Sequence, residues 1–252
     1  PGNIRIAELP EPAPLPNEAL IRVAATSLNR GEIRMAGAGK NGRRIGWDFA
    51  GTVERAAENG LGAPEGSRVV GFLPAGAWAQ RIAAPVDSFA VLPDEVSFAQ
   101  AATLPVAGLT ALYGLEKGSG LLGRRVLVTG GTGGVGHFGI QLARLGGAHV
   151  VATVRSAEKA ALLREAGAHE VVIGEDPQAI AAHGPYDIVL DGVGGPEDKA
   201  EARVWLKRAS DAGHVRASVL LGLMLMAGDG GPADRTAARP LLLFAASAGD
   251  RV

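Results

Sequence analysis

The feature of this chain that most constrains its fold is a glycine-rich segment at residues 130–136, which reads Gly-Gly-Thr-Gly-Gly-Val-Gly. β-Branched residues before it predict a strand at 125–129, and apolar residues at helical spacing after it predict a helix at 134–145. A glycine turn between a strand and a helix exposes backbone N–H groups at the positive end of the helix dipole, where an anion such as a pyrophosphate binds. The segment therefore predicts a dinucleotide-binding unit within a parallel α/β fold.

Three glycines of this segment, Gly131, Gly133 and Gly136, satisfy the Gly-x-Gly-x-x-Gly spacing of such turns. Because glycine has no Cβ, the turn can fold tightly and a pyrophosphate can approach the backbone closely. We expect the cofactor to contact these glycines and the two residues between them, Gly134 and Val135. An ordinary glycine turn without a ligand is the alternative, and the strand and helix on either side disfavour it.

The second strand of the unit is expected at 149–154, and the residues after it favour NADPH over NADH. NAD-binding proteins place an acidic residue there to hold the ribose hydroxyls. This chain has Arg155 and Ser156, with Lys159 one helical turn later. A cation and a hydroxyl can hold a 2′-phosphate through charge-assisted hydrogen bonds, whereas an acid would repel it. Exposed charges on a solvated helix start are the alternative interpretation.

Two further strands, at 170–173 and 186–191, are expected to continue the parallel sheet. Asp191, Gly192 and Val193 end the fourth strand at the carboxyl edge of this sheet. Because open α/β folds bind ligands at that edge, we expect this loop to contact the cofactor. A simple exit from the strand is the open alternative, since Asp and Gly also dominate turns.

The sequence on either side of this unit has a different character. Before it, short β-like runs interrupted by Pro and Gly predict a small, mostly β region with strands at 19–25, 49–56, 67–72, 77–83 and 89–92. After residue 195 the sequence is rich in Ala and Leu and predicts helices. An internal repeat of 36 residues pairs Trp205 with Leu241, Ala209 with Ala245 and Gly213 with Gly249. A period in this range is typical of stacked helix pairs.

Composition restricts both the partners and the chemistry. The formal net charge of −1, from 25 basic and 26 acidic residues, disfavours nucleic acid and acidic membrane surfaces and favours a small-molecule substrate. The chain contains no cysteine, which excludes disulfides, thiolate metal ligands and a cysteine nucleophile, and its five histidines show no ligand spacing. No leader is visible and the longest apolar run, at 219–227, is too short to span a bilayer. We expect a cytoplasmic protein without a metal or a membrane partner.

Four separated segments resemble the medium-chain dehydrogenase/reductase superfamily, in its quinone-oxidoreductase branch. They are Gly-Trp-Asp-Phe-Ala-Gly-Thr-Val at 46–53, Gly-Ser-Arg-Val-Val-Gly at 66–71, Leu-Pro-Val-Ala-Gly-Leu-Thr-Ala at 104–111, and the glycine turn. The resemblance implies an α/β protein with a GroES-like, mostly β substrate domain at 1–106. It further implies a partial Rossmann NADP-binding domain at 107–196.

The resemblance also implies a reaction, which is the transfer of hydride from NADPH to a quinone or an α,β-unsaturated carbonyl. Alcohol-dehydrogenase relatives hold a catalytic zinc through a Cys and through the His of a Gly-His-Glu motif. This chain has Asn29 near the first of these positions and Trp47-Asp48 at the second. A zinc-independent reaction is therefore implied.

Three residues are candidates for catalysis by the same resemblance. Asn29 is expected beside the nicotinamide or the substrate carbonyl and Thr110 at the nicotinamide end, where an amide or hydroxyl donor can stabilise an oxyanion. Tyr113 can donate a proton. Two alternatives stay open: Asn29 as a turn-forming residue and, favoured in this case, Tyr113 as a buried packing residue.

The helical part, at 197–252, resembles the Sel-like class of short repeats, which is related to the tetratricopeptide family. This implies a helical repeat hairpin whose apolar residues pack its own core. Binding of a protein partner at the repeat and formation of a homodimer are the open alternatives. A member of the dehydrogenase family would continue past Gly195 with further parallel strands, which are missing here. The alternative function is therefore a catalytically impaired nucleotide-binding remnant that acts as a protein-interaction scaffold through its helical repeat.

Overall fold

The computed structural model describes residues 4–38, 42–192, 203–204, 206–207, 210–211, 213, 215–229 and 231–247. The chain divides into two compact units, Pro1–Tyr113 and Gly114–Val252. The boundary falls inside helix α3 (Leu109–Glu116). The first unit is built on an antiparallel sheet and the second on a parallel sheet with helices, so the chain has the expected α/β fold.

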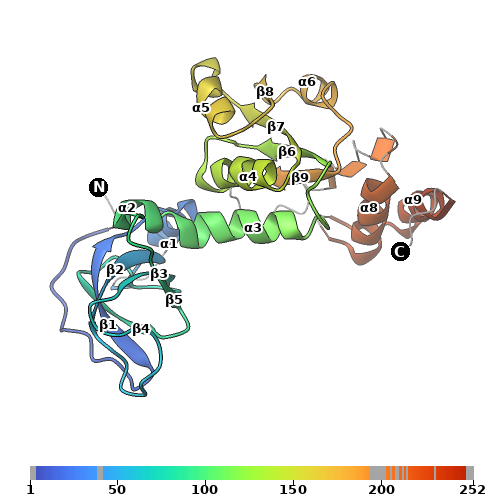
Figure 1. Cartoon of the computed structure of the whole chain (residues 1–252). Coiled ribbons are helices and arrows are strands. Elements are labelled where there is room, and N and C mark those ends of the chain that lie inside the picture. The colour runs from blue at the N-terminus through green and yellow to red at the C-terminus, as the bar shows by residue number, and fades with distance from the viewer. Residues whose placement is uncertain are drawn as a thin grey trace. The chain divides into compact units, whose positions relative to one another are not determined.

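The sheet of the first unit has five strands in the order β4-β1-β2-β3-β5 (Figure 1). Its strands are β1 (Glu18–Ala25), β2 (Asp48–Arg55), β3 (Arg68–Phe72), β4 (Arg81–Pro85) and β5 (Phe89–Val91). Alternate side chains point into one core, where Ile21, Phe49 and Ile82 are almost completely buried. This mostly β unit is the one that the short β-like runs of the sequence predict.

Four of these strands lie within one residue of their predicted bounds, whereas the strand predicted at 77–83 lies at Arg81–Pro85. The reason is a local pairing that occupies the expected start of the strand. The N–H of Ala77 donates to the carbonyl of Gly46 (3.0 Å), and the N–H of Trp78 donates to the carbonyl of Ile45 (3.2 Å). The ladder with β1 therefore begins only at Arg81.

The first unit also contains short helices that the sequence pattern did not predict. They are α1 (Arg30–Ala38), α2 (Phe98–Ala101) and a π-helical turn at Leu104–Gly108. A capping box stabilises α2: Ser97 Oγ accepts from the Gln100 N–H (3.2 Å), and Gln100 Oε1 accepts from the Ser97 N–H (3.1 Å). α2 and the π-helical turn are too short to show an apolar period, and α1 contains Gly31 and Gly37, which disfavour a helix.

The second unit contains a four-stranded parallel sheet in the order β8-β7-β6-β9. Its strands are β6 (Arg125–Thr129), β7 (His149–Val154), β8 (Glu170–Ile173) and β9 (Ile188–Asp191). The helices between them are α4 (Gly134–Leu145), α5 (Ala160–Glu165) and α6 (Pro177–Ala181). The first strand is central and later strands add on both of its sides, which is the order of the first four strands of a Rossmann domain. The predicted bounds are correct for β6, α4, β7 and β8, and β9 begins two residues later than predicted.

Helices cover both faces of the parallel sheet (Figure 1). On one face, Leu127 and Val151 pack in an apolar cluster with Ile180 of α6. On the opposite face, α4 lies so close to the sheet that a Cβ on Gly139 would collide with the Leu190 side chain. Burial on both faces explains why β6 and β7 read as nearly continuous apolar runs.

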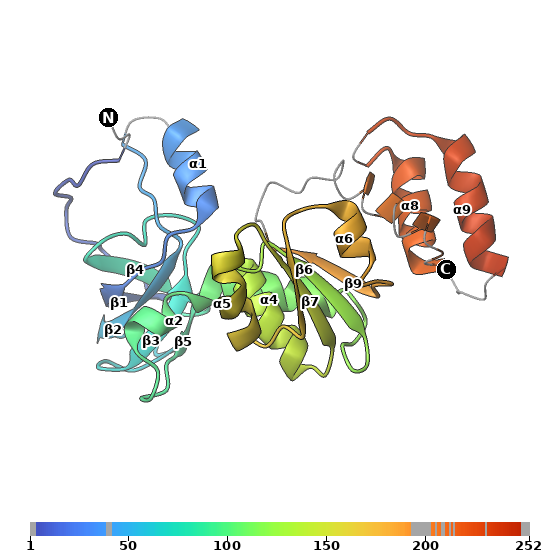
Figure 2. The same ribbon diagram turned by 90° about the horizontal axis from the view of Figure 1, so that it is seen from above.

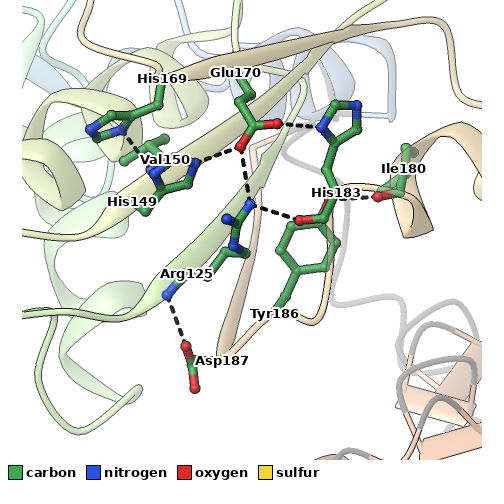
Figure 3. A network of polar contacts seen from close by, with 9 residues as sticks. All are labelled: Arg125, His149, Val150, His169, Glu170, Ile180, His183, Tyr186 and Asp187. Carbon is green, nitrogen blue, oxygen red and sulfur yellow. Dashed lines mark hydrogen bonds and ion pairs between the residues drawn. The ribbon is translucent and has the colours of Figure 1, made fainter.

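A polar network closes the amino edge of this sheet, at the starts of β6, β7 and β8 (Figure 3). At its centre Glu170 pairs with His149 Nε2 (2.6 Å), with Arg125 (3.0 Å) and with His183. The hydrogen bond to His149, followed by the one to His183, lowers the pKa of Glu170 to about 2. Tyr186 lies beside the network and donates to the carbonyl of Ile180 (2.6 Å), and burial raises the pKa of Tyr186 to about 12.

Two helices of the C-terminal part, α8 (Val215–Ala227) and α9 (Arg235–Ser247), lie side by side (Figures 1 and 2). They approach closely at Gly222, where a Cβ would lie 2.8 Å from the Leu242 side chain. Ala245, one of the predicted repeat positions, is completely buried. Three other repeat positions lie outside the described residues: Trp205, Ala209 and Gly249. Within the part of the chain that the structure describes, no helix is long and apolar enough to cross a membrane.

Candidate functional site

The glycine turn follows β6 directly and is tied by backbone hydrogen bonds to the neighbouring strand. Gly130 begins it with a φ of +58°, in the left-handed region that favours glycine. The N–H of Gly131 donates to the carbonyl of Thr153 near the end of β7 (3.1 Å), and the N–H of Gly133 donates to the carbonyl of Gly130 (2.9 Å). The turn is therefore held at the carboxyl edge of the sheet, between β6 and β7.

The three motif glycines are needed for different reasons. A Cβ on Gly136 would collide with the backbone carbonyl of Gly130, and a Cβ on Gly131 would lie 2.9 Å from the Leu163 side chain. Gly133 is exposed, and a Cβ there would meet only carbonyl oxygens, that of Gly192 at 3.2 Å and that of Gly130 at 3.3 Å. Packing therefore requires Gly131 and Gly136, whereas Gly133 leaves open surface where a ligand can approach the backbone.

The start of α4 provides the donors for an anion. Gly133 precedes the helix in an extended conformation, and Gly134 and Val135 form its first turn with Gly136. N–H groups in the first turn have no partner within their helix, and they carry the positive end of the helix dipole. Gly134 is exposed and Val135 is half-buried, so these donors lie at the surface. The residues that the sequence predicts to contact a pyrophosphate thus form one continuous cradle.

The loop after β9 lies directly against this cradle. β6 and β9 are hydrogen-bonded neighbours, and the strand order reverses between them, which is where open α/β sheets bind ligands. Thr129 Oγ1 donates to Asp191 Oδ1 (2.5 Å), and the N–H of Gly192 donates to the carbonyl of Thr129 (3.0 Å). A Cβ on Gly192 would lie 2.5 Å from Gly136 Cα. The structure brings Asp191 and Gly192 beside the turn, while Val193 lies outside the described residues.

The residues predicted to select the cofactor follow β7. Arg155 is 78% exposed, and its Nε donates to Glu175 Oε1 at 2.8 Å. This hydrogen bond raises the pKa of Arg155. Ser156 stands at the N-cap of a 3₁₀ turn, but its side chain makes no capping hydrogen bond, and Lys159 ends that turn in an exposed position. Glu175 was not predicted, since one acid after a short strand carries no motif of its own.

Asn29 lies in the first unit, immediately before α1, in a group of buried polar side chains. Its Nδ2 donates to Asp48 Oδ2 (2.7 Å) and to Ser27 Oγ (3.2 Å). Asp48 is completely buried, and its Oδ1 accepts from the N–H of Val106 in the π-helical turn (2.9 Å). Asp48 therefore joins the segment that contains Asn29 to the segment that precedes Thr110.

This geometry determines which atom of Asn29 can face a ligand. The Asn29 amide turns its NH₂ group toward Asp48, whose carboxyl oxygen Oδ2 accepts from it. Both hydrogens of that group are then directed at Asp48 and Ser27. The atom that remains is Oδ1, an acceptor, whereas the sequence argument expected Asn29 to act as a donor.

A second buried acid fixes the backbone around Asn29. Glu32 is completely buried, and its carboxylate accepts from the N–H of Asn29 (2.6 Å) and from the N–H of Trp47 (2.6 Å). The carbonyl of Asn29 in turn accepts from the N–H of Glu32 (3.1 Å). Asn29 thus also begins a helix, in partial agreement with the turn-forming alternative. No sequence pattern indicated Glu32, whereas Asp48 could have been found from its place in the 46–53 segment.

Thr110 and Tyr113 lie on α3, three residues apart and therefore on one side of the helix. Both side chains are exposed, and Tyr113 is 57% exposed. The interpretation of Tyr113 as a buried packing residue is therefore wrong. The side chain is accessible in the first unit, where it can meet solvent or a ligand.

The described residues contain no group of three or more His, Cys, Asp or Glu side chains arranged to hold a metal ion. His149 and His183 instead belong to the network at the amino edge of the sheet, opposite the glycine turn. His214 lies outside the described residues.

Three family models match the chain. The alcohol dehydrogenase GroES-like domain matches residues 15–94, the zinc-binding dehydrogenase model matches residues 134–210, and the Sel1 repeat matches residues 215–250. The first match covers the antiparallel sheet, the second begins at α4, and the third covers α8 and α9.

Curated relatives come from plants and other organisms. The chloroplast envelope quinone oxidoreductase homolog of Arabidopsis thaliana is 36% identical over 203 residues, covering 73% of this chain and 61% of the relative. The 2-methylene-furan-3-one reductase of Solanum lycopersicum is 32% identical over 217 residues, covering 77% of this chain and 53% of the relative. The chain spans between half and two thirds of the length of these two relatives.

Solved structures show the same likeness. A quinone oxidoreductase from Coxiella burnetii superposes with a TM-score of 0.71 at 33% identity, covering 79% of this chain and 67% of that chain. The quinone oxidoreductase from Thermus thermophilus, whose structures include a complex with NADPH, superposes with a TM-score of 0.68 at 30% identity, covering 81% of this chain and 65% of that one.

Proposed function

The chain belongs to the medium-chain dehydrogenase/reductase superfamily, and from this membership we propose that it transfers hydride from NADPH to a quinone or an α,β-unsaturated carbonyl without zinc. The observation that carries the proposal is the exposed start of α4 at the point where the strand order of the parallel sheet reverses. Helix N–H groups at such a point suit the pyrophosphate of a dinucleotide.

In this proposal the backbone binds the centre of the cofactor. Gly133 lets the pyrophosphate approach, and the N–H groups of Gly134 and Val135 donate to it. Asp191 and Gly192, beside the turn, contact the ribose on the nicotinamide side. Val193 belongs to the same proposed set.

NADPH is proposed over NADH because of the charge after β7. Arg155 and Lys159 are exposed cations, and Ser156 adds a hydroxyl between them. A guanidinium pairs with a phosphate through two N–H groups at once, which strengthens the contact and fixes its direction. Support comes from the structural relatives that were solved with NADPH.

When bound, NADPH supplies the hydride, and the chain's own residues orient the acceptor and donate the proton. The acceptor would gain hydride at a conjugated carbon and a proton at the oxygen that becomes negative, and an enol formed in this way would then revert to the saturated carbonyl. We assign to the Thr110 hydroxyl the hydrogen bond that stabilises this oxygen. The Tyr113 hydroxyl, which is exposed, donates the proton. Asp48 holds the Asn29 amide in place. Asn29 Oδ1 can then accept a hydrogen bond from a hydroxyl of the product or of the cofactor.

Zinc independence is part of the proposal although one matching family model is described as a zinc-binding dehydrogenase. Asn29 and Trp47 stand where alcohol-dehydrogenase relatives have ligands, and the chain has no cysteine. A metal chelator should leave both activity and melting temperature unchanged. A chelator-induced loss that added zinc restores would contradict this part of the proposal.

The test of the reaction is NADPH oxidation, followed by absorbance, with a quinone and with an α,β-unsaturated ketone as separate acceptors. The proposal predicts acceptor-dependent oxidation that falls at least tenfold in Thr110→Val. The same variant should keep its NADPH affinity, because Thr110 is assigned to the acceptor. Saturable NADPH binding without turnover of any acceptor would favour the second candidate function.

That second candidate is a nucleotide-binding remnant that acts as a protein-interaction scaffold. The match of α8 and α9 to the Sel1 repeat favours it, together with exposed apolar side chains on α9, where Leu243 is 59% and Phe244 is 43% exposed. A partner captured by the chain and lost in a Leu243→Asp, Phe244→Asp double variant would support it. A homodimer through the same helices would appear in sedimentation analysis instead.

The domain assignment and the compartment are proposals of the same kind. We assign residues 1–106 to the substrate domain, 107–196 to the cofactor domain and 197–252 to the helical repeat. The cytoplasm is proposed because the chain has no cysteine and therefore needs no oxidising compartment.

A further inference from the structure

Two opposite charges meet at the carboxyl edge of the parallel sheet, one strand away from the glycine turn. Arg155 directly follows β7, and Glu175 follows β8 after one intervening glycine. Arg155 Nε donates to Glu175 Oε1 at 2.8 Å. The guanidinium proposed to receive the 2′-phosphate of NADPH is therefore already paired with an anion of this chain.

The backbone, and not merely two long side chains, brings these residues together. Val154 and Ile173 are register partners in the parallel pair β7–β8. One residue later, the N–H of Gly174 donates to the carbonyl of Val154 at 2.8 Å. Gly174 has a φ of +92°, which favours glycine and turns the chain so that Glu175 follows beside Arg155.

The pair is weak enough to be exchanged for a ligand. The side chain of Arg155 is 78% exposed and that of Glu175 is 64% exposed. Exposed ion pairs contribute little to stability, because water screens both charges. A phosphate carries nearly two negative charges and accepts through several oxygens, so it can displace one carboxylate from a guanidinium. Glu175 would then lie within a few ångströms of the phosphate and repel it.

The other polar groups at this edge do not replace Glu175. Lys159 is an exposed cation that adds to the attraction for phosphate. Glu158 is exposed on the 3₁₀ turn, and Asp176 caps α6 by accepting from the N–H of Gln178 (3.1 Å). Among the described acids, Glu175 is the one that the structure pairs with Arg155.

From this arrangement we infer that Glu175 is a specificity-determining residue, which competes with the 2′-phosphate of NADPH for Arg155 and narrows the preference for NADPH over NADH. NADH has a neutral hydroxyl where NADPH has the phosphate, so it does not suffer the repulsion. The inference rests on the proposed binding of a nicotinamide dinucleotide at the glycine turn. It adds a residue that the glycine motif and the basic segment after β7 do not reveal.

The test compares NADPH and NADH titrations, followed by fluorescence, for the wild-type chain and for Glu175→Gln. Removing one charge from the phosphate site should tighten NADPH binding by about fivefold at low salt, since like charges about 5 Å apart interact appreciably even in water. NADH affinity should change less than twofold. The gain should shrink as ionic strength rises, because the site is exposed. Glu165→Gln is the matched control, since it removes an exposed acid from the end of α5 and should change neither affinity.

A double-mutant cycle isolates the pair from general charge effects. Arg155→Gln should weaken NADPH binding at least tenfold, and Glu175→Gln should give a smaller gain in that background, because only the direct repulsion between Glu175 and the phosphate then remains. Equal changes for NADPH and NADH, or a gain for NADPH that is just as large without Arg155, would overturn the role of Glu175 and leave the proposed function intact. If neither cofactor saturates the wild-type chain or any variant, the proposed function fails, and the inference fails with it.

Discussion

Gly131, Gly133 and Gly136 belong to one turn, but different neighbours limit what can replace them. Gly136 lies against the backbone carbonyl of Gly130, which cannot move without shifting the end of β6. Gly133 lies at the surface with an extended conformation that any residue can adopt. Substitution of Gly136 should therefore mainly reduce stability, whereas substitution of Gly133 should mainly weaken cofactor binding.

Gly136→Ala should lower the free energy of unfolding by about 2–4 kcal/mol, because the added methyl group must push two backbone segments apart. Gly133→Ala should cost less than about 1 kcal/mol, since its nearest neighbours are at 3.2 and 3.3 Å. Urea unfolding followed by circular dichroism measures both values. Equal stability of the two variants would mean that the close contact at Gly136 is not present in solution.

The hydrogen-bonding partners of Asp48 could not be predicted from the sequence. Its place in a family motif could be recognised, but its contacts come from Asn29, 19 positions away, and from Val106, 58 positions away. No local pattern encodes such contacts. The polar side chains of Asn29 and Asp48 were enough to predict a polar site. Which end of the Asn29 amide faces Asp48 depends on a hydrogen bond that forms only when the fold brings the two residues together.

At the scale of secondary-structure elements, the starts of three parallel strands are joined by one carboxylate. Glu170 begins β8 and pairs with His149 at the start of β7 and with Arg125 at the start of β6. The side chain of Glu170 is 31% exposed, so solvent weakens these pairs but does not cancel them. This network should align the strands from the edge opposite the cofactor cradle.

Glu170→Gln should destabilise the chain by about 1–2 kcal/mol at neutral pH and lower its melting temperature by several degrees. The folded pKa of about 2 lies below the ordinary value of 4.5, so the stabilisation is complete above pH 4.5 and is lost as the pH falls toward 2. Thermal melts of both proteins between pH 7 and pH 3 measure this. A difference in melting temperature that does not shrink over that range would contradict the assigned role, and Glu165→Gln is again the control.

The core of the parallel sheet could be predicted because burial on both faces makes β6 and β7 nearly continuous apolar runs, and glycine marks the turn between β6 and α4. The helices α1 and α2 could not be predicted, since they are short and are fixed by contacts such as the Ser97 capping box and the buried Glu32. The strand expected at 77–83 was displaced by pairing with residues 45–46, which are distant in sequence.

At the scale of the whole chain, two known families meet in one sequence. The dehydrogenase-like part ends in a four-stranded parallel sheet among the described residues, and a Sel1 repeat follows. The chain covers about three fifths of the length of the plant quinone-oxidoreductase homologs that it matches. The proposed catalysis requires that this sheet and its loops bind the nicotinamide as well as the pyrophosphate.

The most direct test of the central claim is a titration of the intact chain with NADPH, followed by fluorescence, alongside Gly133→Val. The account predicts saturable binding of one NADPH per wild-type chain, and affinity at least tenfold weaker in the variant, because a branched side chain would fill the space where the pyrophosphate meets the backbone. Circular dichroism must show the variant to be folded, as the open surface at Gly133 leads us to expect. Equal affinity of a folded Gly133→Val variant, or no saturable binding by the wild-type chain, would contradict the claim.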